Sequence, residues 1–111
     1  MSKTLTLHVA KDFTPFLAGR YKADGPGSGE ALREILAAAL ASNDKVRIDF
    51  DGTAMAPASF LEEVFGGLAR DAGENDEAIG RVRARIEVVC NERPVVCTQA
   101  LRYFDEAKRS K

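Results

Sequence analysis

The stretch VRIDFDGTAMAPASFLEEVFGGL, residues 46–68, decides how this chain folds, because it predicts a strand, a bent loop and a helix in succession. Val46, Ile48 and Phe50 alternate with charged residues, which is typical of a strand with one buried and one solvated face. A central strand covered by helices on both faces would be apolar almost throughout. We therefore expect a strand over 45–51 in a sheet that keeps one face open.

The second half of this stretch predicts a helix over residues 59–72. Its apolar positions recur at helical spacing: Leu61, Val64, Phe65, Leu68 and Ala72. Ser59 and Glu62 form the S-x-x-E pattern of a capping box, which predicts Ser59 as the helix N-cap. The pair Gly66–Gly67 costs helix stability and indicates that another backbone crosses this helix closely.

Upstream, residues 4–10 alternate and predict a strand with His8 on its polar side. Residues 19–22 predict a short second strand, antiparallel to the first. A glycine-rich loop follows at 24–30, where Ser28 is the expected N-cap of a helix that ends at residues 42–44.

Downstream, residues 73–77 form a polar connection, and residues 78–83 predict no more than a short turn. Residues 85–90 alternate again and predict a strand. A last helix begins near Pro94, since proline suits a first helical turn.

These elements predict one α/β domain over residues 1–111 with two layers. We expect a small mixed sheet of about four strands with helices mainly on one face. The open face of that sheet is a candidate surface for a homodimer.

Composition limits the classes of function. The chain has 111 residues, with 16 basic and 17 acidic side chains, so no basic surface for nucleic acid is expected. No apolar run is long enough to span a membrane, and the N-terminus does not resemble a signal peptide, so we expect a cytoplasmic protein. Cys90 and Cys97 lack metal or redox spacing and are expected to be free thiols, and no metal or cofactor is predicted.

The segment DFDGT, Asp49 to Thr53, resembles the DxDGT motif of haloacid-dehalogenase-like phosphatases. That resemblance implies a Mg²⁺-dependent phosphatase with Asp49 as nucleophile and Asp51 as acid/base. The chain lacks the family's downstream lysine and its paired acidic motif at a strand end, because its first lysine after Asp51 is Lys108. This function is the alternative rather than the favoured one.

A second resemblance covers most of the chain. Four segments carry it: GRY at 19–21, DGPGSGEALRE at 24–34, VRIDFDG at 46–52 and SFLEEVFGGL at 59–68. Together they are similar to the STAS-like domain family of unknown function, and the last segment is the most specific. The resemblance implies a STAS-like fold and, without an established activity in the family, no reaction.

STAS domains proper include the bacterial anti-sigma-factor antagonists, in which a protein-kinase-like ATPase phosphorylates a serine in a DSSG pattern. Aligned on that pattern, Ser59 matches, while Pro57 and Phe60 replace the acid and the glycine. The resemblance implies a regulatory module that binds a protein partner, a histidine-kinase-like ATPase among the candidates. Its candidate contact residues are Asp51, Pro57, Phe60, Glu62 and Glu63, with Ser59 as the candidate phosphorylation site.

Two interpretations of local features stay open at this point. Ser59 either caps its helix and does nothing more, or also faces a partner kinase, where a phosphate would be favoured by the helix start and repelled by Glu62 and Glu63. The glycine-rich loop, Gly25 to Gly29, either makes a turn or cradles an anion on its backbone N–H groups.

Overall fold

Three parallel strands form the sheet in the computed structural model, which describes residues 3–73 and 75–107. They are β1 (Thr4–His8), β2 (Lys45–Asp49) and β3 (Ile86–Val89), in the spatial order β1-β2-β3. Their register aligns Leu7, Ile48 and Val88 across the sheet. The prediction of a mixed sheet of about four strands is wrong in both number and direction.

The missing strand is the one predicted over residues 19–22. This segment has no sheet partner among the described residues and runs into a single 3₁₀ turn, η2 (Lys22–Asp24). The Asp24 carboxylate accepts the backbone N–H of Arg20 at 3.2 Å and of Tyr21 at 2.9 Å. A side chain therefore takes the hydrogen bonds that a neighbouring strand would have taken.

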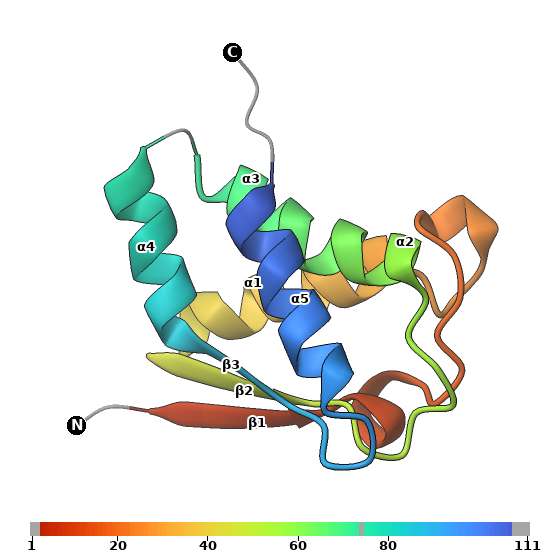
Figure 1. Cartoon of the computed structure of the whole chain (residues 1–111). Helices are drawn as coiled ribbons and strands as arrows, with labels where there is room; N and C mark the ends of the chain where they lie inside the picture. The colour runs from red at the N-terminus through yellow and green to blue at the C-terminus, as the bar shows by residue number, and fades with distance from the viewer. Residues whose placement is uncertain (1–2, 74, 108–111) are drawn as a thin grey trace.

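The helices lie together on one side of the sheet, as predicted (Figure 1). A short π-type turn, η1 (Val9–Phe13), follows β1, and α1 (Gly29–Ser42) leads into β2. Next come α2 (Ala58–Leu61), η3 (Glu62–Gly66) and α3 (Gly67–Asp71), which share αR backbone angles at their junctions and so form one helix with a π-type middle. The last elements are α4 (Asp76–Arg85), β3 and α5 (Val95–Glu106).

The helix α4 corrects a second prediction, since residues 78–83 belong to a ten-residue helix and not to a short turn. Asn75 caps this helix by accepting the backbone N–H groups of Glu77 and Ala78 at 2.7 and 3.2 Å. Glu74, in the predicted polar connection, lies outside the described residues.

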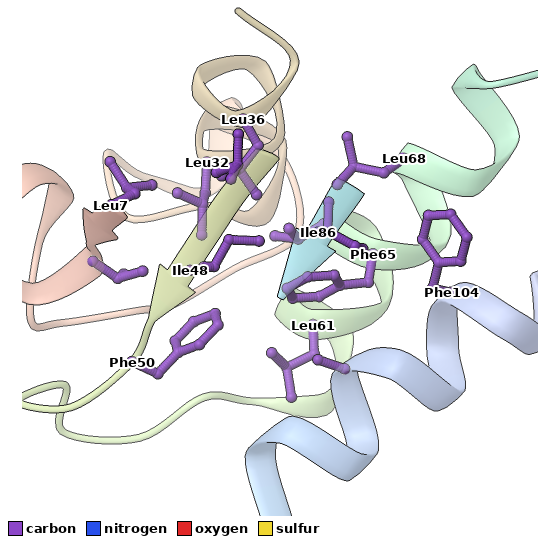
Figure 2. Packing of buried hydrophobic residues seen from close by; sticks show 14 of the residues in the cluster. Leu7, Leu32, Leu36, Ile48, Phe50, Leu61, Phe65, Leu68, Ile86 and Phe104 are labelled. Atoms are coloured by element: carbon purple, nitrogen blue, oxygen red, sulfur yellow. The ribbon is translucent and has the colours of Figure 1, made fainter. Parts of the chain in front are cut away.

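The core fills the space between the sheet and its helical layer (Figure 2). Ile48 and Phe50 project from the central strand and its end, and Phe65 meets Phe50 with ring centroids 6.2 Å apart. The other fully buried large apolar side chains come from several elements: Val9, Leu32, Leu36, Val46, Phe60, Leu61, Val64 and Phe104. Burying about ten such side chains is the main favourable contribution to folding.

The open face of the sheet is polar and carries its own ion pairs. His8 Nδ1 lies 3.4 Å from Asp49 Oδ2, and Arg47 Nε lies 3.0 Å from Glu87 Oε1. The expectation of a solvated face is confirmed by the exposure of His8 and Arg47. The homodimer through this face stays a prediction.

Within the described residues, no helix is both long and apolar enough to cross a membrane.

Candidate functional site

The turn after β2 is fastened to the loop after β3 by Asp51. One carboxylate oxygen accepts the backbone N–H of Glu92 at 2.9 Å, and the other accepts the side-chain amide of Asn91 at 3.0 Å. The backbone N–H of Gly52 returns a bond to the Glu92 carboxylate at 2.8 Å. The hydrogen bond from the Glu92 N–H, aided by Asn91, lowers the pKa of Asp51. Asp51 therefore holds two loops together as a carboxylate.

Asp49, the other acid of the DFDGT segment, also interacts with residues of the chain itself. It accepts the backbone N–H of Asp51 at 2.9 Å and faces His8 across the sheet. Among the described residues, no three or more His, Cys, Asp or Glu side chains are grouped so that they could hold a metal ion. Both acids of the DFDGT segment are thus already bonded to backbone N–H groups of the chain itself, and the phosphatase function stays a prediction. The segment joins the turn after β2 to the loop after β3 by hydrogen bonds, and we call this set of hydrogen bonds the bracket.

Thr53 continues this bracket toward the loop that leads to α2. Its hydroxyl donates to the Phe50 carbonyl at 2.7 Å and accepts from Arg93 Nη2 at 2.6 Å. The next residue, Ala54, donates its backbone N–H to the Pro15 carbonyl at 2.8 Å. The loop after Thr53 is therefore held against the segment around Pro15, as Figure 1 shows beside α2.

The two paired segments and the helix start that follows them carry exposed residues, which we name together the Ser59 surface. It consists of Phe16, Ala54, Met55, Ala58 and Ser59. Phe16 is 74% exposed and Met55 is 61% exposed, the two highest values among the large apolar side chains described. Contiguous exposed apolar patches mark interaction sites, and these two side chains make the Ser59 surface a candidate for such a site.

Ser59 lies on this surface with its hydroxyl unused by the described part of the chain. The helix N-cap is Pro57, with φ −60° and ψ 150°, and its carbonyl accepts the first helical bond from Leu61 at 3.0 Å. The prediction that Ser59 caps the helix is therefore wrong. The capping box is absent as well, because Glu62 turns away to bind arginines.

Glu62 and Glu63 bind three arginines in one cluster at the back of this helix. Arg20 contacts both carboxylates, and Arg70 Nη1 lies 2.8 Å from Glu62 Oε2. Arg33 pairs with Glu63, whose side chain is 8% exposed. Hydrogen bonds from Arg70 and then Arg20 lower the pKa of Glu62 against the opposing effect of burial. We call these five residues the arginine cluster.

Two of the predicted partner contacts do not fit that role. Phe60 is fully buried in the core, and Glu63 is buried within the arginine cluster. A partner could reach neither side chain without rearranging the helix. Asp51, Pro57 and Glu62 are half-buried and stay predictions.

The glycine pair of this helix explains how the arginine cluster fits. A Cβ on Gly67 would lie 2.6 Å from both Cδ and Nη1 of Arg33. The nearest neighbour of Gly67 is therefore an arginine side chain that crosses the helix to reach Glu63. The predicted close crossing of this helix by another element is confirmed for η3, which packs against α1 and α5. A backbone approach occurs at Gly29, where a Cβ would lie 2.7 Å from the Phe60 carbonyl oxygen.

The arginines themselves were missed by sequence reasoning. Arg20 and Arg33 lie about 30 to 43 residues from their acidic partners, so no local spacing connects them. The available signal was the acidic pair Glu62–Glu63 one turn before two glycines, which leaves room for a long side chain.

The glycine-rich loop binds its own chain. The backbone N–H groups of Gly29 and Glu30 donate to the carbonyls of Gly19 and Arg20 at 3.0 and 2.9 Å. A hollow beside the loop is lined by Phe13, Thr14, Phe16, Ala18, Asp24, Gly25, Pro26 and Gly27. Its one charged residue, Asp24, is acidic, so this lining does not favour an anion. Ser28 is buried and caps α1 by accepting the Ala31 N–H at 3.2 Å, as predicted.

Cys90 and Cys97 are free thiols, as predicted. Burial raises the pKa of both, more than nearby backbone N–H groups lower it. A raised thiol pKa opposes a nucleophilic role.

The comparison with protein families links this fold to a known group. The family profile described as the STAS-like domain of unknown function (DUF4325) matches residues 28–92. Comparisons with curated proteins and with solved structures gave no match. The matched range runs from the N-cap of α1 through the central strand, the start of α2 and the acidic pair to the loop after β3, which is more than half of the chain. The chain therefore belongs to the family of STAS-like domains of unknown function.

Proposed function

We propose that this protein is a non-enzymatic regulatory module that binds a protein partner through the Ser59 surface. The observation that carries the proposal is an unused Ser59 hydroxyl, within the described residues, at the start of the helix that follows two hydrogen-bonded segments with strongly exposed apolar side chains, Phe16 and Met55. Membership of the STAS-like family supports the class of module.

The surface is suited to docking because its backbone is already fixed. The loop before α2 is held by the hydrogen bonds of Ala54 to Pro15 and of Arg93 to Thr53. A partner that binds here would order few additional residues, which lowers the entropic cost of association. Met55 also adapts its shape to different apolar surfaces.

The finer part of the proposal is a switch at Ser59 operated by a partner ATPase-kinase. A phosphate on Ser59 would lie in the first turn of a continuous helix that runs from α2 to α3, where the N–H groups of the helix start favour negative charge. Glu62 and Glu63, one turn later, are paired with arginines. Their repulsion of a phosphate is thereby weakened.

The test is a binding and phosphorylation assay with histidine-kinase-like ATPases as candidate partners, read by pull-down and by intact mass. Met55→Asp and Phe16→Ser should abolish capture, and Ser59→Ala should abolish any gain of one phosphate. Ile35→Ser is the matched control, because Ile35 is an exposed apolar side chain on α1 outside the Ser59 surface. Equal loss of capture in the Ile35 variant, or capture that survives both surface variants, would refute the proposed site.

A further inference from the structure

The hollow beside the glycine-rich loop, which we call the Asp24 hollow, has a volume of about 570 Å³. Three residues with rings take part in its lining, Phe13, Phe16 and Pro26, and Asp24 is its single charged residue. Phe13 is half-buried and packs against the core, whereas Phe16 is 74% exposed. A hollow of this size can hold a group as large as a long side chain.

The two walls of the Asp24 hollow are fixed to each other by the backbone. The Ala18 N–H donates to the Gly27 carbonyl at 3.0 Å, and the Phe16 N–H donates to the Thr14 hydroxyl at 3.2 Å. A Cβ on Gly27 would clash with the Phe16 carbonyl oxygen, so a glycine is needed for the two segments to lie this close. The hollow is therefore preformed, and a ligand would order little of the chain on binding.

The carboxylate of Asp24 keeps one oxygen for a ligand. Its Oδ2 accepts the backbone N–H groups of Arg20 and Tyr21, and its Oδ1 accepts no hydrogen bond from the described residues. The exposed position of Asp24 leaves that oxygen within reach of a partner.

The negative charge of Asp24 is also not neutralised by the described part of the chain. The two basic residues nearest to it in sequence bind other acids, because Arg20 contacts Glu62 and Lys22 contacts Glu34. No other lysine or arginine of the described residues forms an ion pair with Asp24. Rings around one unpaired carboxylate favour an organic cation over an anion or a neutral apolar group.

We propose that the Asp24 hollow receives an arginine side chain of the partner protein, with its guanidinium against Asp24 Oδ1 and the Phe16 ring. The proposal rests on the proposed function, because Phe16 belongs both to this hollow and to the Ser59 surface. A guanidinium suits the lining, since it donates to a carboxylate and also stacks on an aromatic face. The methylene stem of the arginine would lie against the remaining rings.

The probe for this site is the blocked tripeptide acetyl-Gly-Arg-Gly-amide, titrated into the ¹⁵N-labelled full chain and followed by two-dimensional NMR. It should shift the backbone amides of Gly25 and Gly27 with a dissociation constant on the order of ten millimolar. The same peptide with citrulline in place of arginine has nearly the same shape without the charge, and it should bind about fivefold more weakly. Equal shifts from both peptides, or none from the arginine peptide, would overturn the proposal.

Asp24→Asn removes the charge and keeps a side-chain oxygen for the N–H groups of Arg20 and Tyr21. It should weaken binding of the arginine peptide about fivefold, to the level of the citrulline peptide. Asp44→Asn is the matched control, because Asp44 is an exposed aspartate that accepts the Lys3 N–H at 2.7 Å before the start of β2. It should bind the peptide like the parent chain, and unchanged binding in Asp24→Asn contradicts the proposal.

Phe16→Leu covers the case in which the Asp24 variant disturbs its own turn. This substitution keeps an apolar side chain and removes the ring, so it should weaken binding of the arginine peptide about threefold. Binding as tight as that of the parent chain would count against the proposed stacking and overturn the proposal.

Capture of the partner separates this inference from the proposed function. Loss of capture in both Asp24→Asn and Met55→Asp, with capture kept in Asp44→Asn, would support both. Capture lost in Met55→Asp and complete in Asp24→Asn would keep the Ser59 surface and overturn the arginine-binding hollow. Capture that survives Met55→Asp and is lost in Asp24→Asn would refute the Ser59 surface and support the hollow.

Discussion

Replacing Gly67 by alanine tests whether the arginine cluster depends on a glycine in the middle of the helix. Gly67 has ordinary helical angles, φ −62° and ψ −42°, so its backbone does not require glycine. By propensity alone, Gly67→Ala should stabilise the helix by about 1 kcal/mol. The new Cβ would however lie 2.6 Å from two atoms of Arg33, which must move by roughly 1 Å to reach normal contact distance.

Moving Arg33 disturbs its pair with Glu63, and that pair sets the magnitude. Breaking a buried ion pair completely costs about 3–5 kcal/mol, because the remaining charge stays unpaired. Here Arg20 still contacts Glu63 at 3.3 Å, and Arg33 is partly exposed and can settle elsewhere. We take the loss as about 2 kcal/mol, which leaves Gly67→Ala destabilised by about 1 kcal/mol after the gain in propensity.

Gly80 supplies the matched control, because it lies inside α4 with open space beside it. A Cβ at this position would meet no neighbouring group within 4 Å. Gly80→Ala should therefore raise the free energy of unfolding by about 1 kcal/mol. Urea unfolding followed by far-UV circular dichroism should separate the two variants by about 2 kcal/mol. If Gly67→Ala is stabilised as much as Gly80→Ala, Arg33 does not need the space that the glycine leaves, and the reasoning is refuted.

Three further outcomes follow from the hydrogen bonds and pKa shifts. Ser28→Ala should lose about 1 kcal/mol of stability because it removes a buried cap, whereas Ser59→Ala should change stability by less than about 0.5 kcal/mol, as measured by urea unfolding. The pKa of Glu62 is lower in the folded state than its ordinary 4.5, so its contribution to stability is full above that value and is lost as the pH falls through the folded pKa. Glu62→Gln should therefore flatten the acid limb of a stability-against-pH curve, and an unchanged limb would contradict the pairing. Asp51→Asn should speed amide exchange at Glu92, and protection equal to the parent's would argue against the bracket.

The sequence predicted the strands well where burial alternates cleanly. Val46 and Ile48 are fully buried while Lys45 and Arg47 are exposed, so the period of two marks β2 directly. The same alternation correctly implied helices on one face. Parallel direction is typical of strands joined by helices, as β1, β2 and β3 are, but the expected extra strand, antiparallel to the first, made the predicted sheet mixed.

The errors arose where a side chain decided the local structure. The Asp24 carboxylate accepts the backbone N–H groups of Arg20 and Tyr21, so these groups are not available to a neighbouring strand. A pattern of apolar residues does not predict such a side-chain hydrogen bond. The helix α4 buries little, with Ile79 as its one buried residue, so its periodicity is weak. The arginine cluster joins segments far apart in sequence, and only the folded chain brings them together.

The way in which α2 begins determines whether the Ser59 hydroxyl is needed for the fold or can take part in recognition. A serine that caps a helix is bonded to its own backbone, and its replacement alters folding as well as recognition. Here Pro57 supplies the extended residue before the helix, and proline fixes that φ without any side-chain bond. The described part of the fold therefore does not use the Ser59 hydroxyl, in contrast to that of Ser28. Any loss of partner binding in Ser59→Ala would consequently report on recognition at this surface and not on the stability of the domain.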